Sequence, residues 1–160
     1  MEHRIEATWI GRRRFNALVG GHTIVMDAPE RVGGEDQGTI PKPLVLTALA
    51  GCTGMDVAAL LDRSGHALDS LAITVDGELS QGHPMRYTAV RILFDMSGTA
   101  ESQAAAVAAV ERSQRELCGV SAMLQAIMPV RWEVRFNGAL VLEGLAGRGT
   151  EGRPRDGSDH

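Results

Sequence analysis

The sequence predicts an α+β protein in which antiparallel strands pack on one long buried helix. Residues 44–61 form an apolar run of helical length, and residues 5–26 and 71–96 alternate apolar and polar side chains as strands do. A second helical pattern then separates residues 71–96 from a last alternating segment at 130–136. At 160 residues the chain suits a single domain with a sizeable core.

The N-terminal segment is predicted to form three strands. Apolar residues alternate along residues 5–9, 15–19 and 24–26. Gly11 and the Gly20-Gly21 pair fall where hairpin turns would join these strands. The following stretch "APERVGGEDQGTIPKP" is rich in glycine and proline, which indicates a loop.

The helix predicted at Leu44–Leu61 is apolar nearly all round. Pro41 or Pro43 would suit its first turn, and Gly65 would suit its C-terminal end. A helix without a charged face is buried on all sides. In a chain of this size, such burial is easiest to arrange if a second subunit covers part of the helix.

The remaining elements are predicted in order along the chain. Strands at 71–79 and 90–96 precede a helix from about Thr99 to Cys118, and a short helix after Ser121 stops before Pro129. A last strand covers 130–136, with valine and aromatic residues on its inner face. The predicted organisation is one domain at 1–142 and a polar, glycine-rich, disordered tail at 143–160.

Composition argues against several classes of function. The net charge is −4, and Arg12–Arg14 is the densest basic cluster, so nucleic-acid binding is not expected. The N-terminus lacks a signal-peptide core, and the apolar run containing Asp56 is interpreted as a core helix, not a membrane span. Two cysteines make no disulfide framework, so a cytoplasmic location is expected. The histidines and cysteines lack zinc-ligand spacing, and neither a metal nor a cofactor is expected.

A candidate site lies inside the apolar run, in "LTALAGCTGMDVAALL". Cys52 and Asp56 are separated by one helical turn, so their side chains share a face. The second cysteine, Cys118, closes the next predicted helix. Thiol chemistry is the covalent chemistry with clear candidate residues. Alternatives remain open: the cysteines could be inert core residues, Asp56 a structural ion-pair partner, and Gly54 a site of close helix packing.

Two segments that carry the cysteines resemble one family. "GGEDQGTIPKPLVLTALAGCTGMDV" and "SQRELCGVSAML" are similar to the first- and second-cysteine segments of the OsmC/Ohr family, the osmotically inducible and organic hydroperoxide resistance proteins. "ATWIGRRRF" followed by "GGHTIVMDAP" is similar to the N-terminal hairpin of that family. The resemblance covers roughly residues 4–137 and is strongest to a less characterised OsmC-like branch. It implies the OsmC-like fold, an intertwined homodimer and active sites at the subunit interface.

The resemblance also implies a thiol-dependent peroxidase that reduces organic hydroperoxides. Cys52 would attack the peroxide as a thiolate and become a sulfenic acid, and Cys118 would condense with it to a disulfide. Arg14, with Arg12 as second choice, would hold the thiolate and polarise the peroxide. A dithiol reductant, with a lipoyl-bearing protein as one candidate, would restore the two thiols.

One position departs from the peroxidase branches, which place a glutamate ten residues before the first cysteine to orient the arginine. Lys42 stands there and cannot accept a hydrogen bond from arginine. Asp56, Glu35 and Asp36 are alternative partners for that arginine.

The resemblance further implies an apolar substrate lining from Leu49, Met55, Met123 and Leu124. The alternative function is a family member that binds a small apolar or thiol-containing ligand, or a structural dimer, with little peroxidase activity.

Overall fold

The computed structural model describes residues 2–148 of the chain. These residues belong to two compact units, residues 1–47 and residues 48–160, which we call unit 1 and unit 2 and describe separately. The boundary falls within the long helix α1 (Pro43–Ser64), which begins at one of the two prolines proposed for its first turn.

Unit 1 contains the predicted three strands. They are β1 (Glu6–Gly11), β2 (Arg14–Val19) and β3 (His22–Met26), and they form an antiparallel sheet in the order β1-β2-β3. The predicted glycines lie at both hairpins, and Gly11, Gly20 and Gly21 all have positive φ. A loop with a single 3-10 turn at Glu30–Val32 then leads toward α1.

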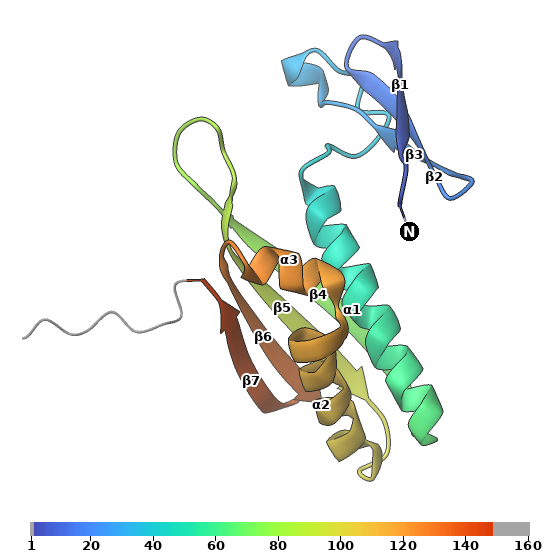
Figure 1. Cartoon of the computed structure of the whole chain (residues 1–160), viewed down its shortest axis with the longest axis vertical. Helices are drawn as coiled ribbons and strands as arrows, with labels where there is room; N and C mark the ends of the chain where they lie inside the picture. Colours follow the sequence, from blue (N-terminus) through green and yellow to red (C-terminus); the bar gives the residue numbers. More distant parts are fainter. Residues whose placement is uncertain (1, 149–160) are drawn as a thin grey trace, which may run out of the picture. The chain divides into compact units, whose positions relative to one another are not determined.

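Unit 2 contains a four-stranded sheet and the remaining helices (Figure 1). The strands are β4 (Ser70–Leu79), β5 (Tyr87–Ser97), β6 (Pro129–Phe136) and β7 (Ala139–Gly147), in the order β4-β5-β6-β7. Between β5 and β6 the chain forms α2 (Ser102–Arg112), a π-helical turn η2 (Ser113–Leu117) and α3 (Gly119–Gln125). The α+β class predicted from the sequence is confirmed.

One strand pairing differs from the expected antiparallel arrangement. β5 and β6 pair in parallel, with Val90 opposite Val130 and Met96 opposite Phe136. Parallel neighbours need a long crossover connection, and the α2-η2-α3 segment is that crossover. The alternation of apolar residues indicated two strands but carried no information on their relative direction.

The boundary predicted for the disordered tail was also wrong. Residues 143–147 belong to β7, which pairs antiparallel with β6 from Phe136↔Ala139 to Pro129↔Gly147. Asn137 and Gly138 both have positive φ and make the tight turn between these strands. An Asn-Gly pair is a strong hairpin signal, and it was overlooked in the sequence. The rest of the proposed tail, 149–160, lies outside the described residues.

The core of unit 2 lies between the sheet and the helices. The inward faces predicted for β5 and β6 are buried, with Phe94 and Trp132 as the largest buried side chains. From α1 a single stripe is buried, at Leu49, Thr53, Val57 and Leu61. Gly54 lies where a Cβ atom would come within 2.9 Å of Ile73 Cδ1, so this glycine permits close packing of α1 against β4.

The other faces of α1 are not covered within the chain. Only 22% of its most apolar window is buried, and Met55 is 71% exposed. Of the described helices, α1 alone is long and apolar enough to cross a membrane by length and composition, a test that a core helix also passes. Within the single chain one stripe of α1 is buried, and burial of the other faces by a second subunit stays a prediction.

The second predicted helix is not a regular α-helix to its end. It changes to π-helical geometry after Arg112, and α3 starts at Gly119, two residues before the predicted position. A π-helical turn adds a residue to the turn and rotates everything after it. Leu117, the last residue of this turn, is exposed.

Candidate functional site

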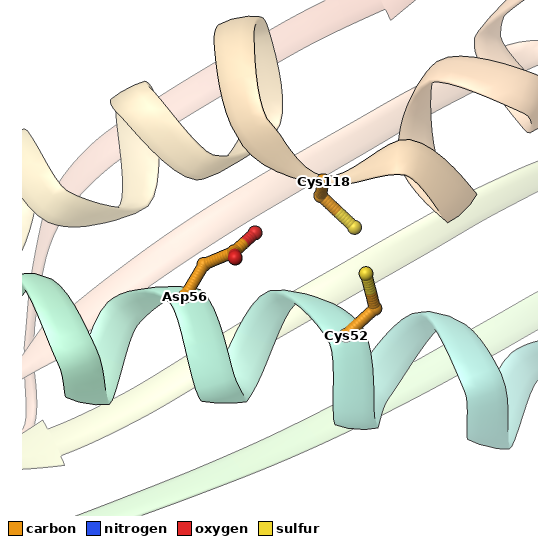
Figure 2. Close-up of side chains that lie close together, drawn as sticks. All are labelled: Cys52, Asp56 and Cys118. Atoms are coloured by element: carbon orange, nitrogen blue, oxygen red, sulfur yellow. The ribbon is translucent and has the colours of Figure 1, made fainter. Parts of the chain in front are cut away.

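The two cysteines meet in unit 2 although they are far apart in sequence. Figure 2 shows Cys52 on α1 and Cys118 on the segment between η2 and α3, with their side chains pointing toward one another. Both thiols are free. The two sulfur atoms and a carboxylate oxygen of Asp56 all lie within 4.8 Å of one another. Cys52 and Asp56 share one helix face, as their spacing indicates.

The π-helical turn determines where Cys118 lies. The backbone N–H of Cys118 donates to the carbonyl oxygen of Ser113 at 2.9 Å, five residues earlier, and this bond closes the π turn. Cys118 then leaves helical geometry and becomes the N-cap of α3, where its Sγ accepts from the N–H of Ser121 at 3.4 Å. Cys118 is thus held by its backbone at the end of the π turn and by its side chain at the start of α3.

The two sulfurs have different environments. Cys118 is buried, with 3% of its surface exposed, whereas Cys52 is half-buried. The pKa of the Cys118 thiol is raised to about 12, mainly because the thiol is buried. The N–H of Ser121 favours the thiolate and so acts in the opposite direction. Cys52 and Asp56 raise the pKa further. Cys118 therefore remains a neutral thiol at physiological pH.

Asp56 is bound by a hydroxyl group in unit 2. Ser113 Oγ donates to Asp56 Oδ2 at 3.0 Å. Asp56 takes part in none of the ion pairs found in residues 2–148, so the expected arginine partner is not seen there. The hydrogen bond from Ser113 satisfies one carboxylate oxygen of this half-buried side chain.

A buried polar network supports Ser113 from behind. Thr53 Oγ1 and Ser113 Oγ lie 2.9 Å apart, and Gln114 Nε2 donates to Thr53 Oγ1 at 2.6 Å. Ser121 Oγ donates to Gln114 Oε1 at 2.8 Å, and Gln125 Nε2 donates to Ser121 Oγ at 2.9 Å. The network joins α1, η2 and α3 next to the cysteines, and sequence reasoning had not found it.

The arginines proposed for the site lie in unit 1, where they share one carboxylate. Arg12 Nε lies 3.5 Å from Glu35 Oε1, and Arg14 Nη1 lies 3.8 Å from Glu35 Oε2. The Arg14 side chain is 31% exposed and that of Arg12 is 65% exposed. Asp36, another suggested partner, is exposed and forms no ion pair within the described part of the chain. The side chains of Arg12, Arg14 and Glu35 line part of a pocket of about 570 Å³. Glu30, Gly34 and Gln37 complete its lining.

Asp27 organises the loop that carries Glu35. Its carboxylate accepts from the backbone N–H groups of Ala28 at 2.8 Å, Glu35 at 3.1 Å and Gln37 at 3.2 Å. Burial pushes the pKa of Asp27 up, but these three donors and the charge of Arg14 outweigh it, so the pKa lies below the ordinary value. Gly34 is required in the same loop because a Cβ atom there would overlap the carbonyl of Ala28. Asp27 was not among the candidates from the sequence, although an aspartate at the start of a glycine-rich loop is typical of such turns.

The predicted substrate-lining residues divide into two pairs. Leu49 and Leu124 are buried in the core of unit 2, whereas Met55 and Met123 are exposed, at 71% and 66%. Lys42 lies in the turn before α1, where its carbonyl accepts from the N–H of Val45 at 3.1 Å. Lys42 makes none of the ion pairs in residues 2–148.

A long apolar helix packed on a sheet, with one cysteine on that helix and a second at a crossover junction, defines a two-thiol protein of the OsmC-like fold. The family model described as OsmC-like protein matches residues 34–133. The chain therefore belongs to the OsmC-like family, as the resemblance of its cysteine segments indicated.

Relatives support the same assignment. Protein YhfA of Escherichia coli strain K12 is 28% identical over 126 residues, which cover 78% of this chain and 90% of that protein. A hypothetical protein from Aquifex aeolicus has a similar crystal structure, with a TM-score of 0.70 at 24% identity, covering 85% of this chain and 98% of that one. An organic hydroperoxide resistance protein OsmC from Legionella pneumophila superposes with a TM-score of 0.62 at 18% identity, covering 84% and 96%. At these identities the two crystal structures show the fold.

Proposed function

We propose that the protein is a thiol-dependent peroxidase that reduces organic hydroperoxides with Cys52 and Cys118. The observation that carries the proposal is the meeting of two free thiols from residues 66 positions apart, one half-buried and one buried. Membership of the OsmC-like family supports it, since a structural relative from Legionella pneumophila is described as an organic hydroperoxide resistance protein.

The difference in exposure supports a separate role for each cysteine. Cys52 is the more accessible sulfur and is the peroxidatic nucleophile. Its thiolate attacks the distal peroxide oxygen, the O–O bond breaks, and the alkoxide leaves with a proton as an alcohol. The resulting Cys52 sulfenic acid condenses with the Cys118 thiol, which forms the disulfide and releases water. A dithiol reductant then exchanges with the disulfide, restores both thiols and is itself oxidised.

Arg14 is proposed as the cation that stabilises the Cys52 thiolate and polarises the peroxide. This assignment comes from the family resemblance, and Arg12 is the second candidate. A guanidinium near a thiolate favours the charged form. We further propose that Glu35 takes the orienting role of the glutamate replaced by Lys42, because its carboxylate lies near both arginines.

A homodimer is part of the proposal. The uncovered faces of α1, with 22% of the apolar window buried, are the surface that a second copy would cover. Light scattering at micromolar concentration is expected to give the mass of two chains. A stable folded monomer would remove the basis for an interfacial site.

Bulky organic hydroperoxides are expected to react faster than hydrogen peroxide. The exposed thioethers of Met55 and Met123 offer apolar surface for such substrates. Turnover is expected to be slow, because Lys42 replaces the glutamate that orients the arginine in the peroxidase branches. A catalytic arginine displaced by about 1 Å costs on the order of a hundredfold in rate. Stopped-flow oxidation of the reduced protein by cumene hydroperoxide and by hydrogen peroxide measures both properties.

Cysteine variants test the mechanism. Cys52→Ser should consume no peroxide, whereas Cys118→Ser should complete one turnover and leave a sulfenic acid that a dimedone probe traps. A thiol titration before and after one equivalent of cumene hydroperoxide should show the loss of both thiols in the parent. Equal peroxide consumption in both variants and the parent would overturn the mechanism. An intact dithiol after exposure would favour the alternative, a small-ligand-binding or structural dimer.

A further inference from the structure

Three side chains that can bind a metal ion converge beside the thiol pair. Cys52 and Asp56 project from consecutive turns of α1, and Cys118 projects from the N-cap of α3 toward them (Figure 2). Two sulfurs and one carboxylate oxygen lie within 4.8 Å of one another. In a tetrahedral zinc site, Zn–S distances near 2.3 Å and Zn–O distances near 2.0–2.2 Å place neighbouring ligand atoms about 3.5–3.8 Å apart. The observed limit of 4.8 Å is about 1 Å longer than that spacing, so the three side chains are expected to move closer together on binding.

Two of the three ligand side chains, those of Asp56 and Cys118, are already held by hydrogen bonds. Ser113 Oγ donates to Oδ2 of Asp56, and no hydrogen bond of the described chain reaches Oδ1, which is available to a metal. The N–H of Ser121 holds Sγ of Cys118. Hydrogen bonds of this kind orient metal ligands and are a regular feature of protein metal sites. The Thr53–Gln114 network fixes Ser113 in turn.

We propose that the reduced protein binds one Zn²⁺ ion through Cys52, Asp56 and Cys118, with a fourth position open. Two thiolates and one carboxylate suit a borderline-soft ion such as Zn²⁺ and disfavour Mg²⁺ and Ca²⁺, which prefer oxygen ligands alone. Both thiols lose their protons to solvent on binding, so binding weakens as pH falls. The two cysteines come from separate elements and lie 66 positions apart in the sequence, which is why no ligand spacing was visible in it.

Bound zinc has a consequence for activity that rests on the proposed function. With both sulfurs held by the ion, neither the attack on peroxide nor the formation of the disulfide can begin. Zinc is then a reversible inhibitor of the reduced enzyme. The disulfide form lacks two of the three ligands, so the oxidised protein is expected not to bind the ion.

Cobalt binding tests the site without reference to peroxidase activity. Reduced protein titrated with Co²⁺ in the absence of oxygen should show sulfur-to-cobalt charge transfer and the visible bands of a tetrahedral ion, and one equivalent of Zn²⁺ should displace it. Asp56→Asn should weaken Co²⁺ binding at least about tenfold. Asp62→Asn, an exposed aspartate of the same helix, is the matched control and should bind like the parent. The double variant Cys52→Ser/Cys118→Ser should lose the charge-transfer band.

Each contrary result overturns the assignment. Zn²⁺ binding that persists in the double variant would place the metal elsewhere on the chain. Unchanged affinity in Asp56→Asn would remove the third ligand. Arg14→Gln, expected to be inactive toward peroxide under the proposed function, should still bind Co²⁺. If the parent protein binds Co²⁺ but reduces no peroxide, the peroxidase proposal is rejected and the metal site is retained. If the parent reduces peroxide but binds no Co²⁺, the metal site is rejected and the peroxidase proposal is retained.

Discussion

The two units hold their functional side chains by opposite means. In unit 2 a buried polar network, in which Thr53 and Gln114 are almost fully enclosed, lies next to the cysteines. In unit 1 the arginines are held by an ion pair to Glu35 that is largely exposed to solvent. The buried network cannot rearrange without leaving polar groups unsatisfied, whereas the exposed pair can break and form at small cost.

Because of this difference, the buried network of unit 2 contributes to stability, whereas the ion pairs of unit 1 can rearrange. Polar groups in a low-dielectric interior fix one geometry because every alternative leaves unpaired donors or acceptors. Exposed ion pairs contribute little to stability and are screened by salt. The thiols of unit 2 are therefore held in one geometry. The arginines of unit 1 are instead positioned by the carboxylate of Glu35, which lies on a loop and can move.

The largest loss of stability is expected from Gln114→Leu in unit 2. The leucine would leave Thr53 Oγ1 without its donor and Ser121 Oγ without its acceptor, both in buried positions. We expect the free energy of unfolding to fall by about 3 kcal/mol, measured by urea denaturation. The exposed Gln103 of α2 is the matched control, and Gln103→Leu should change stability by no more than about 0.5 kcal/mol. Equal effects of both variants would show that the network does not hold the unit together.

A smaller and pH-dependent effect is expected from Asp27→Asn in unit 1. The pKa of Asp27 lies below its ordinary value of 3.8, so its carboxylate stabilises the folded loop at neutral pH. That stabilisation is complete above about pH 4 and is lost as pH falls through the lowered folded-state pKa, because protonation weakens the bonds from the Glu35 and Gln37 amides. The variant should be less stable than the parent at pH 7, and the difference should shrink as the pH falls below 3.8. Hydrogen exchange of the two amides measures this, and a difference that persists unchanged in acid would contradict it.

The smallest effect on stability is expected from Glu35→Gln. Its ion pairs with Arg12 and Arg14 are exposed, so the free energy of unfolding should change by less than about 0.5 kcal/mol. If Glu35 orients the arginine, the rate of oxidation by cumene hydroperoxide should nevertheless fall by about tenfold or more. Asp36→Asn is the matched control in the same loop and should leave both quantities unchanged. A parental rate in Glu35→Gln would remove its proposed orienting role.

Much of the fold could be predicted from local patterns. The alternation at Val90–Met96 and at Val130–Phe136 indicates that each strand has one buried face. In the structure that face is buried in each strand, as expected. The positions of Gly11 and Gly20 marked the hairpins because tight turns need positive φ. The turn at Asn137-Gly138 carried the same kind of signal and was overlooked, which placed the end of the folded region too early.

The strand pairing and the contacts at the candidate site depended on residues far apart in the sequence, which local patterns do not report. The parallel pairing of β5 and β6 follows from the direction of a crossover, and strand periodicity is the same for either direction. At the site, the i, i+4 spacing placed Cys52 beside Asp56, but it could not place Ser113, which is 57 residues away from Asp56. The π-helical turn that redirects the chain at Gln114 has no clear sequence signature.

Because Cys118 lies on the crossover between β5 and β6, the two thiols are expected to come together late in folding. Contacts between α1 and η2 join residues 57–61 positions apart, so loop-closure entropy opposes them until the strands have paired. During synthesis, α1 with Cys52 precedes the segment that carries Cys118, so we expect the two sulfurs to meet only after the crossover has docked. Proximity of the thiols is therefore a property of the finished molecule, and a partly folded chain would expose two separate cysteines to unrelated partners.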